Sequence, residues 1–207
     1  MVSQTDWEGF ATIASLDREP GMDRCIHSAY LDLSRTLTGM ATFADAQAWH
    51  RCTAASLKSQ LDALTSRSRW SREEFDAWHR AATFQLIETA AGAGFPLTVG
   101  QAQKWINMSI KNEIALGDRL MPGLSCVYDV AHVALDRVVL GELRRKDWMS
   151  RELLQRPWSK LRDYEEYMTC QRLIRENLPG IPLEEEFHIW EEGRRRNQPD
   201  GVLYQAE

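Results

Sequence analysis

Two lysines and one aspartate are the residues whose types and spacing could do chemistry. Lys104, Met108 and Lys111 are spaced at i, i+4 and i+7, so a helix would place them along one face. Asp136 lies in an otherwise apolar run, where a carboxylate needs a partner because its desolvation is costly. An unprotonated lysine amine beside a carboxylate can act as a nucleophile. Asp136 could also cap the helix that follows it, and Met108 could be a core residue.

Helices must position these groups. Ser71 with Glu74, and Thr98 with Gln101, are capping-box pairs that predict helices over residues 71–91 and 98–116, joined by a tight turn. The helical period also predicts helices over four further ranges: 44–64, 127–143, 159–177 and 183–192. Alternating runs of β-branched residues are absent from the sequence, so we expect an all-α fold. Residues 1–192 are expected to form one helical domain or two lobes around a cleft, followed by a flexible tail over 193–207.

Composition narrows the class of protein. The 207 residues include 25 basic and 30 acidic ones, a net charge of −5, which argues against a purely electrostatic nucleic-acid binder. Residues 141–162 are locally basic, with seven basic and three acidic residues, and could face phosphate. The four cysteines are widely scattered, which favours reduced thiols in a cytoplasmic protein over a disulfide framework or a zinc site. No stretch approaches about 18 consecutive apolar residues and residues 1–10 lack a basic-then-apolar pattern, so we expect neither a membrane span nor a secretory leader.

The order of the chemical residues resembles the helix-hairpin-helix DNA glycosylases, and specifically their archaeal-type 8-oxoguanine branch. That branch has a lysine that opens a helix, a second lysine seven residues later and an aspartate about thirty residues on, which Lys104, Lys111 and Asp136 match. It also ends with a Pro-Leu segment and an acidic residue four before a tryptophan, as in Glu186 and Trp190. Glu186 stands where the family usually has aspartate. The resemblance covers residues 92–190 and hardly touches residues 1–71.

The resemblance implies a DNA glycosylase with AP lyase activity that removes 8-oxoguanine or a related modified base. Lys104 would attack C1′ of the nucleotide, release the base and leave a Schiff base on the sugar. Burial is expected to lower the pKa of Lys104 for this attack. Asp136 would stay ionised and stabilise positive charge on the sugar. The flipped base would lie among four further residues: Lys111, Met108, Glu186 and Trp190.

The resemblance also implies a hairpin that binds DNA phosphate, here Leu97, Thr98, Val99 and Gly100. The expected partner is double-stranded DNA containing a damaged or modified base, bound by a cytoplasmic monomer away from any membrane. No cofactor and no metal are expected, because lysine chemistry needs neither. The remaining tryptophans are assigned to helix packing: Trp49, Trp70, Trp78, Trp105, Trp148 and Trp158.

Two other functions fit the sequence. A helical DNA-binding or regulatory protein could keep the fold without catalysis, as the acidic net charge and the irregular hairpin sequence favour. An active glycosylase could instead act on another substrate, such as a modified phage base. The first is distinguished by whether Lys104 reaches Asp136 in a closed pocket, and the second by a panel of modified oligonucleotides.

Overall fold

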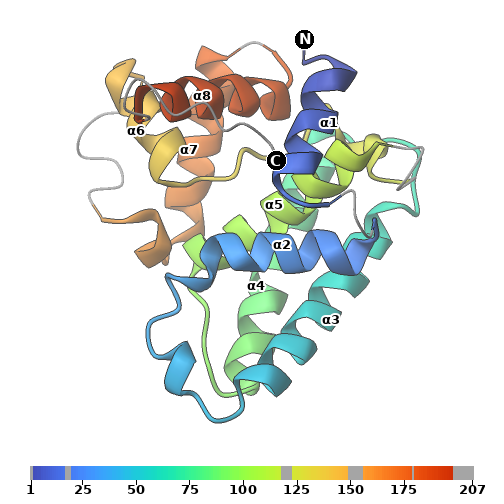
Figure 1. The fold of residues 1–207 in the computed structure, drawn as a ribbon, viewed down its shortest axis with the longest axis vertical. Coiled ribbons are helices and arrows are strands. Elements are labelled where there is room, and N and C mark those ends of the chain that lie inside the picture. Colours follow the sequence, from blue (N-terminus) through green and yellow to red (C-terminus); the bar gives the residue numbers. More distant parts are fainter. Residues whose placement is uncertain (1, 17–19, 118–122, 149–155, 179, 198–207) are drawn as a thin grey trace, which may run out of the picture.

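The regular structure of the described residues is entirely helical (Figure 1). This computed structural model describes residues 2–16, 20–117, 123–148, 156–178 and 180–197. The α-helices in this part of the chain are α1 (Gln4–Ile13), α2 (Met22–Ser34), α3 (Ala46–Leu64), α4 (Arg72–Gly92), α5 (Val99–Leu116), α6 (Arg137–Arg145), α7 (Tyr164–Asn177) and α8 (Pro182–Asn197). Short 3-10 turns lie at η1 (Met40–Thr42), η2 (Leu124–Val127) and η3 (Trp158–Lys160). The predicted all-α class is confirmed.

Helix α5 runs through the middle of the molecule (Figure 1). All of its residues except Ile114 are buried, including both lysines of the predicted site. Helices α1, α2 and α4, together with η3, pack around it. Because α5 is enclosed on all sides, its polar side chains must find partners inside the protein.

The two predicted capping boxes begin helices α4 and α5. Ser71 caps α4 and Thr98 caps α5, and in each case the residue three positions later completes the box. The turn between α4 and α5 contains Gly94, whose φ of +93° lies in the left-handed region that favours glycine. This part of the prediction is confirmed within one residue at each boundary.

The helix predicted over residues 127–143 is wrong in its first half. Residues 131–136 have no regular secondary structure, and α6 begins only at Arg137, after Asp136 as its N-cap. Side chains from other helices bind the backbone of this 131–136 segment. Gln171 accepts from the Val133 amide and donates to the Val133 carbonyl, at 3.1 and 2.8 Å. The buried backbone is therefore satisfied without a helix.

Two further boundaries differ from the prediction. Residues 158–160 form η3, and α7 starts at Tyr164 because the Asp163 carboxylate accepts from the Glu165 amide as an N-cap. Helix α8 continues to Asn197, so the first residues of the predicted flexible tail are helical. Arg196 in this extension pairs with Glu142 at 2.7 Å. Residues 198–207 lie outside the described part of the chain.

The apolar core has two clusters. The larger one is built mainly from α1 to α5, and the smaller one from α6 and α7. Helix α8 contacts both, since Leu183 and Phe187 belong to the larger cluster and Ile189 to the smaller one. Helix α5 is shared in the same way, because its first residue, Val99, belongs to the smaller cluster. The candidate site is lined by side chains from these two shared helices.

Candidate functional site

A cleft of about 600 Å³ brings together the six residues predicted for the nucleophile, its partner and the base pocket. These residues are Lys104, Met108, Lys111, Asp136, Glu186 and Trp190. They come from α5, the start of α6 and α8, which are separated by up to 86 positions along the chain. The cleft also receives side chains from α1, α2 and η3.

Lys104 and Asp136 form a buried ion pair in this cleft. The Lys104 Nζ lies 2.8 Å from Oδ2 of Asp136, and the Lys104 residue is only 5% exposed. The other oxygen of Asp136 accepts hydrogen bonds from the amides of Val138 and Val139, each at 2.9 Å. Asp136 therefore caps α6 and holds Lys104 at the same time. The two interpretations of this residue, as a helix cap and as the partner of the lysine, are both compatible with its contacts.

The ion pair with Asp136 favours the protonated form of Lys104. Burial acts to lower the pKa of Lys104, but the carboxylates of Asp136 and Glu186 and the hydrogen bond that Lys104 donates to Asp136 raise it above its usual value. Burial acts to raise the pKa of Asp136, and Lys104 with the Val139 amide more than offsets this and holds the pKa low. The expectation of a lowered pKa for Lys104 is wrong, because the neighbouring carboxylates outweigh the effect of burial. The amine needs a proton acceptor before it can attack.

Lys111 and Glu186 form a second ion pair, deeper in the protein. Their Nζ and Oε1 atoms lie 2.8 Å apart, and both side chains are nearly inaccessible. The second oxygen of Glu186 accepts from the Ala134 amide at 3.1 Å. The Lys111 ammonium also lies 5.1 Å from the ring centre of Phe10. Glu186 thus joins α5 to the 131–136 segment, and both of its carboxylate oxygens already have a partner.

Met108 and Trp190 supply apolar walls of the cleft. Met108 is 7% exposed and belongs to the larger core cluster, so it packs in the core and also faces the cleft. Trp190 is half-buried, and its ring meets the Phe10 ring edge-on at 6.2 Å. A planar group between such walls gains apolar contact on both faces.

The prediction that residues 97–100 form a phosphate-binding hairpin is wrong. The Thr98 amide donates to Gln101 at 3.0 Å, and the Gly100 amide donates to the Leu161 carbonyl at 3.0 Å. Leu97 and Val99 are buried. A Cβ on Gly100 would come within 1.8 Å of the Trp158 carbonyl oxygen, so this backbone lies directly against η3. The segment packs inside the protein and does not offer the amides of Thr98 and Gly100 to DNA.

The basic stretch over residues 141–162 is partly neutralised. Arg145 pairs with Glu142 at 2.8 Å, and Lys146 lies 3.6 Å from Glu192. Residues 149–155 lie outside the described part. In contrast, the exposed Arg35 and Arg137 line the cleft, and neither has an ion-pair partner among the residues that the structure describes.

The sequence analysis missed the contribution of the N-terminal helices. Phe10 and Ile13 of α1, and Ser28 and Asp32 of α2, line the cleft. The i, i+4 spacing of Ser28 and Asp32 was the available signal, but residues 1–71 showed no resemblance that would have connected it to the lysines. Trp158, which was assigned to packing, also lines the cleft.

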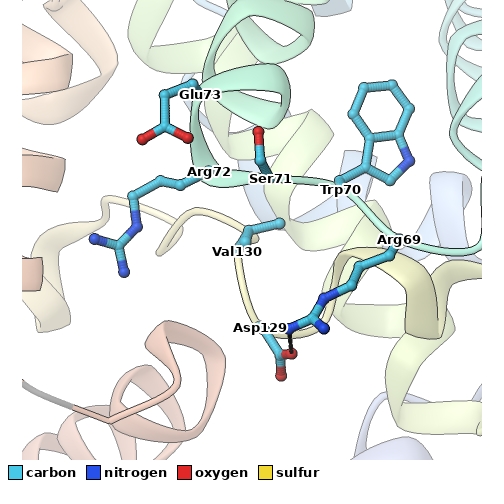
Figure 2. A pocket seen from close by; sticks show the side chains of 7 residues that line it. All are labelled: Arg69, Trp70, Ser71, Arg72, Glu73, Asp129 and Val130. Atoms are coloured by element: carbon cyan, nitrogen blue, oxygen red, sulfur yellow. Dashed lines mark ion pairs between the residues drawn. The ribbon is translucent and has the colours of Figure 1, made fainter.

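A second hollow lies at the start of α4 (Figure 2). It holds none of the predicted site residues, and its Arg69 lies 3.9 Å from Asp129, with both side chains largely exposed. Ser71 in this hollow is committed to the capping box, because its hydroxyl accepts from the Glu74 amide. The arrangement has the ordinary chemistry of a helix start.

The described residues contain neither a metal cluster nor a membrane-spanning helix. Over the described ranges, no cluster of three or more His, Cys, Asp or Glu side chains could hold a metal ion. Nor does any helix in those ranges combine the length and apolar character that crossing a membrane requires. Comparisons with family models, curated proteins and solved structures find no match to this chain.

Proposed function

We propose that this protein is a DNA glycosylase with AP lyase activity that acts on duplex DNA containing 8-oxoguanine or a related modified base. One observation carries the proposal: Lys104 and Asp136 form a 2.8 Å pair inside a cleft that also contains Lys111, Glu186, Met108 and Trp190. Perturbed titratable groups that converge on a concave site are typical of catalysis.

The cleft supports a covalent mechanism. Its volume of about 600 Å³ is typical of small-molecule sites and suits one extruded nucleotide. The Lys104 nitrogen would form a bond to C1′ as the bond between C1′ and the base breaks, and the sugar would then open to a Schiff base. The Asp136 carboxylate lies close enough to the amine to stabilise the positive charge that develops on the sugar.

The base would be recognised at the deeper end of the cleft. Trp190 and Met108 would hold its faces, and the Lys111 ammonium would donate to an acceptor on its edge. Glu186 would accept from a donor on the base through lone pairs that its present partners leave available. Discrimination between bases would arise from this pair, because an unmatched buried charge is costly.

In this proposal, DNA phosphates are bound by exposed arginines that line the cleft. Arg35 follows α2 and Arg137 begins α6, and both are exposed. Two arginines at the entrance can bind the backbone on either side of an extruded nucleotide, although the protein as a whole is acidic. They take the role that the sequence analysis gave to residues 97–100.

A helical DNA-binding or regulatory protein without catalysis is the second candidate function. The observation that favours it is the raised pKa of Lys104, which is held in its charged form by Asp136 and Glu186 after burial has acted to lower it. Such a protein would bind modified DNA and leave it intact.

Borohydride trapping distinguishes the two functions. Protein incubated with a panel of modified-base duplexes, 8-oxoguanine and phage-type bases included, is expected to give a covalent adduct with at least one of them. Lys104→Arg keeps the cation beside Asp136 and removes the Schiff-base amine, so it should abolish the adduct. Lys58→Arg, at an exposed pair with Asp23, is the matched control. An adduct that persists in Lys104→Arg would overturn the assignment, and DNA binding without any adduct would favour the second function.

A further inference from the structure

Asp32 is a third carboxyl group in the cleft, and nothing in the sequence analysis assigned it a role. It lies on α2, one turn after Ser28, and lines the cleft with Lys104 and Asp136. The other two carboxylates use both of their oxygens in hydrogen bonds. Asp32 makes neither a hydrogen bond nor an ion pair with any residue that the structure describes. It is therefore the cleft carboxyl with free capacity to take or give a proton.

Charged groups from four parts of the cleft lining face Asp32. They are Arg35 just after α2, Lys104 and Lys111 on α5, Asp136 and Arg137 at the start of α6, and Glu186 on α8, whereas α1 and η3 contribute only apolar side chains to the lining. Burial raises the pKa of Asp32, the Lys104 ammonium lowers it, and Asp136 raises it again. The pKa stays above the usual value, while the pKa of Asp136 is lowered through Lys104 and its amide bonds despite burial. Of these two carboxylates, Asp32 is the stronger base.

We propose that Asp32 is the proton carrier of the glycosylase reaction, taking a proton from Lys104 and delivering it to the departing base. This inference rests on the proposed function. The proton moves from the Lys104 ammonium to the Asp32 carboxylate, which leaves a free amine. The lone pair of that amine forms the bond to C1′, and the electron pair of the bond between C1′ and the base leaves with the base. The carboxylic acid of Asp32 then protonates the base nitrogen, so the carboxylate is restored.

Substrate entry drives the first transfer. A bound nucleotide displaces water from the cleft, and charged groups are disfavoured when they lose solvent. The neutral amine of Lys104 and the neutral carboxylic acid of Asp32 then become more favourable than the two charged forms. Asp136 serves this transfer poorly, because its Oδ1 is held by two amides and its Oδ2 faces the lysine that must stay in place.

Asp32→Asn separates base removal from lysine reactivity. The Asp32 carboxylate helps to raise the pKa of Lys104, although burial and Asp136 act on it more strongly, so its loss leaves the amine at least as easy to deprotonate. A duplex with a preformed abasic site presents an aldehyde and needs no base to depart. We expect Asp32→Asn to slow single-turnover release of the modified base by about 100-fold or more, as loss of a general acid–base group does. Trapping on the abasic duplex should fall far less, because water in the unfilled base site can take the Lys104 proton and no departing base needs one.

Two more variants complete the test. Asp23→Asn, at an exposed position on the same helix, should leave both reactions unchanged. Asp32→Glu keeps an acid and should restore part of the base release, which also covers the case in which Asp32→Asn folds poorly. A parallel loss of both reactions in Asp32→Asn and Asp32→Glu would overturn the inference, as would normal base release by Asp32→Asn. Wild-type protein that is trapped on neither duplex would refute the proposed function, and the inference with it.

Discussion

Gln103 holds both polar backbone groups of Leu135, the residue immediately before Asp136. Its Nε2 donates to the Leu135 carbonyl at 3.0 Å, and its Oε1 accepts from the Leu135 amide at 3.2 Å. Gln103 is fully buried and precedes Lys104 on α5. The helix that carries the amine thus also fixes the backbone that carries its carboxylate partner, so the distance between the two groups depends on one neighbouring amide.

Gln103→Leu should loosen this connection. The change leaves the buried amide and carbonyl of Leu135 without these partners, which costs about 1–3 kcal/mol per unsatisfied group. We expect a lower free energy of unfolding in urea and a marked loss of borohydride trapping, because Asp136 moves relative to Lys104.

Gln171→Leu is the matched control for this prediction. Gln171 binds Val133 with the same pair of hydrogen bonds, but two residues farther along the chain from Asp136. It should lower stability to a similar degree and reduce trapping far less. Equal losses of trapping in the two variants at equal stability would show that Gln103 acts on the whole fold and not on Asp136.

Asp136→Asn should reverse the direction of the Lys104 pKa shift. Asparagine is a good N-cap, so α6 keeps its start, but the negative charge is lost. Burial, which acts to lower the pKa of Lys104, is then opposed mainly by the more distant Glu186 and Asp32, and the pKa should fall below its usual value of 10.5. Reductive methylation of Lys104, followed by mass spectrometry across the alkaline range, measures this change.

The stability of the same variant should show the matching pH dependence. In the native protein the folded pKa of Lys104 is raised, so its stabilisation is present below pH 10.5 and is lost as pH rises through the folded value. In Asp136→Asn the folded pKa is lowered, so stability should increase as pH rises towards 10.5. Urea unfolding of both proteins between pH 8 and 10 gives the slope of the unfolding free energy against pH for each of them. Parallel slopes would contradict the coupling.

The sequence predicted the elements that have local signals. The capping pairs at Ser71 and Thr98 are set by residues three positions apart, so α4 and α5 were predicted within one residue. The 131–136 segment was mistaken for helix because its partners, such as Gln171 and Glu186, lie tens of residues away along the chain. Its apolar composition gave no sign that side-chain amides would replace a helical backbone.

The sequence likewise predicted some residues of the candidate site and missed others. Lys104 and Asp136 were found because they stand at a recognisable spacing, and they do meet in the structure. Asp32 was not found, because its importance depends on how α2 packs along α5. The phosphate interpretation of residues 97–100 came from the resemblance alone, and it did not hold because Gly100 packs against the Trp158 carbonyl and donates its amide to Leu161.

A buried chain of hydrogen bonds behind the site should be sensitive at its centre. Tyr167 accepts from Asn107 at 2.9 Å and lies 2.8 Å from Nδ1 of His132, whose other ring nitrogen lies 2.7 Å from Asp76. Tyr167→Phe removes the link between two buried polar groups and should lower the free energy of unfolding by about 1–3 kcal/mol.

Tyr164→Phe is the control at the end of the same chain. Tyr164 meets His79 at 2.8 Å, but Thr83 lies 3.4 Å from the same ring nitrogen and can take over the contact. We expect a smaller loss of stability than in Tyr167→Phe, measured by chemical denaturation of both variants. A larger loss of stability in Tyr164→Phe than in Tyr167→Phe would show that Tyr167 is not the critical link of the chain.

Mild acid should destabilise the protein through the two histidines of this chain. Burial lowers the pKa of His132 and holds the pKa of His79 well below the usual value of 6.5. The unfolded chain binds protons that the folded protein resists, so full stability is present above about pH 6.5 and is lost as pH falls towards the folded pKa values. Unfolding free energies between pH 7 and 5 should fall, and His79→Gln should flatten the slope. An unchanged slope in that variant would assign the acid sensitivity to other groups.

Arg35 and Arg137 should contribute to DNA affinity through charge and not through base recognition. Both are exposed at the cleft, so Arg35→Ala and Arg137→Ala should weaken binding to modified and unmodified duplexes by similar factors. Each lost phosphate contact should also reduce the slope of log K against log salt by about 0.9. Arg51→Ala, at an exposed position on α3 outside the cleft lining, should change neither quantity. Fluorescence anisotropy at several salt concentrations measures the affinity and its salt dependence. An effect confined to the modified duplex would show that these arginines contact the base and not the phosphate backbone.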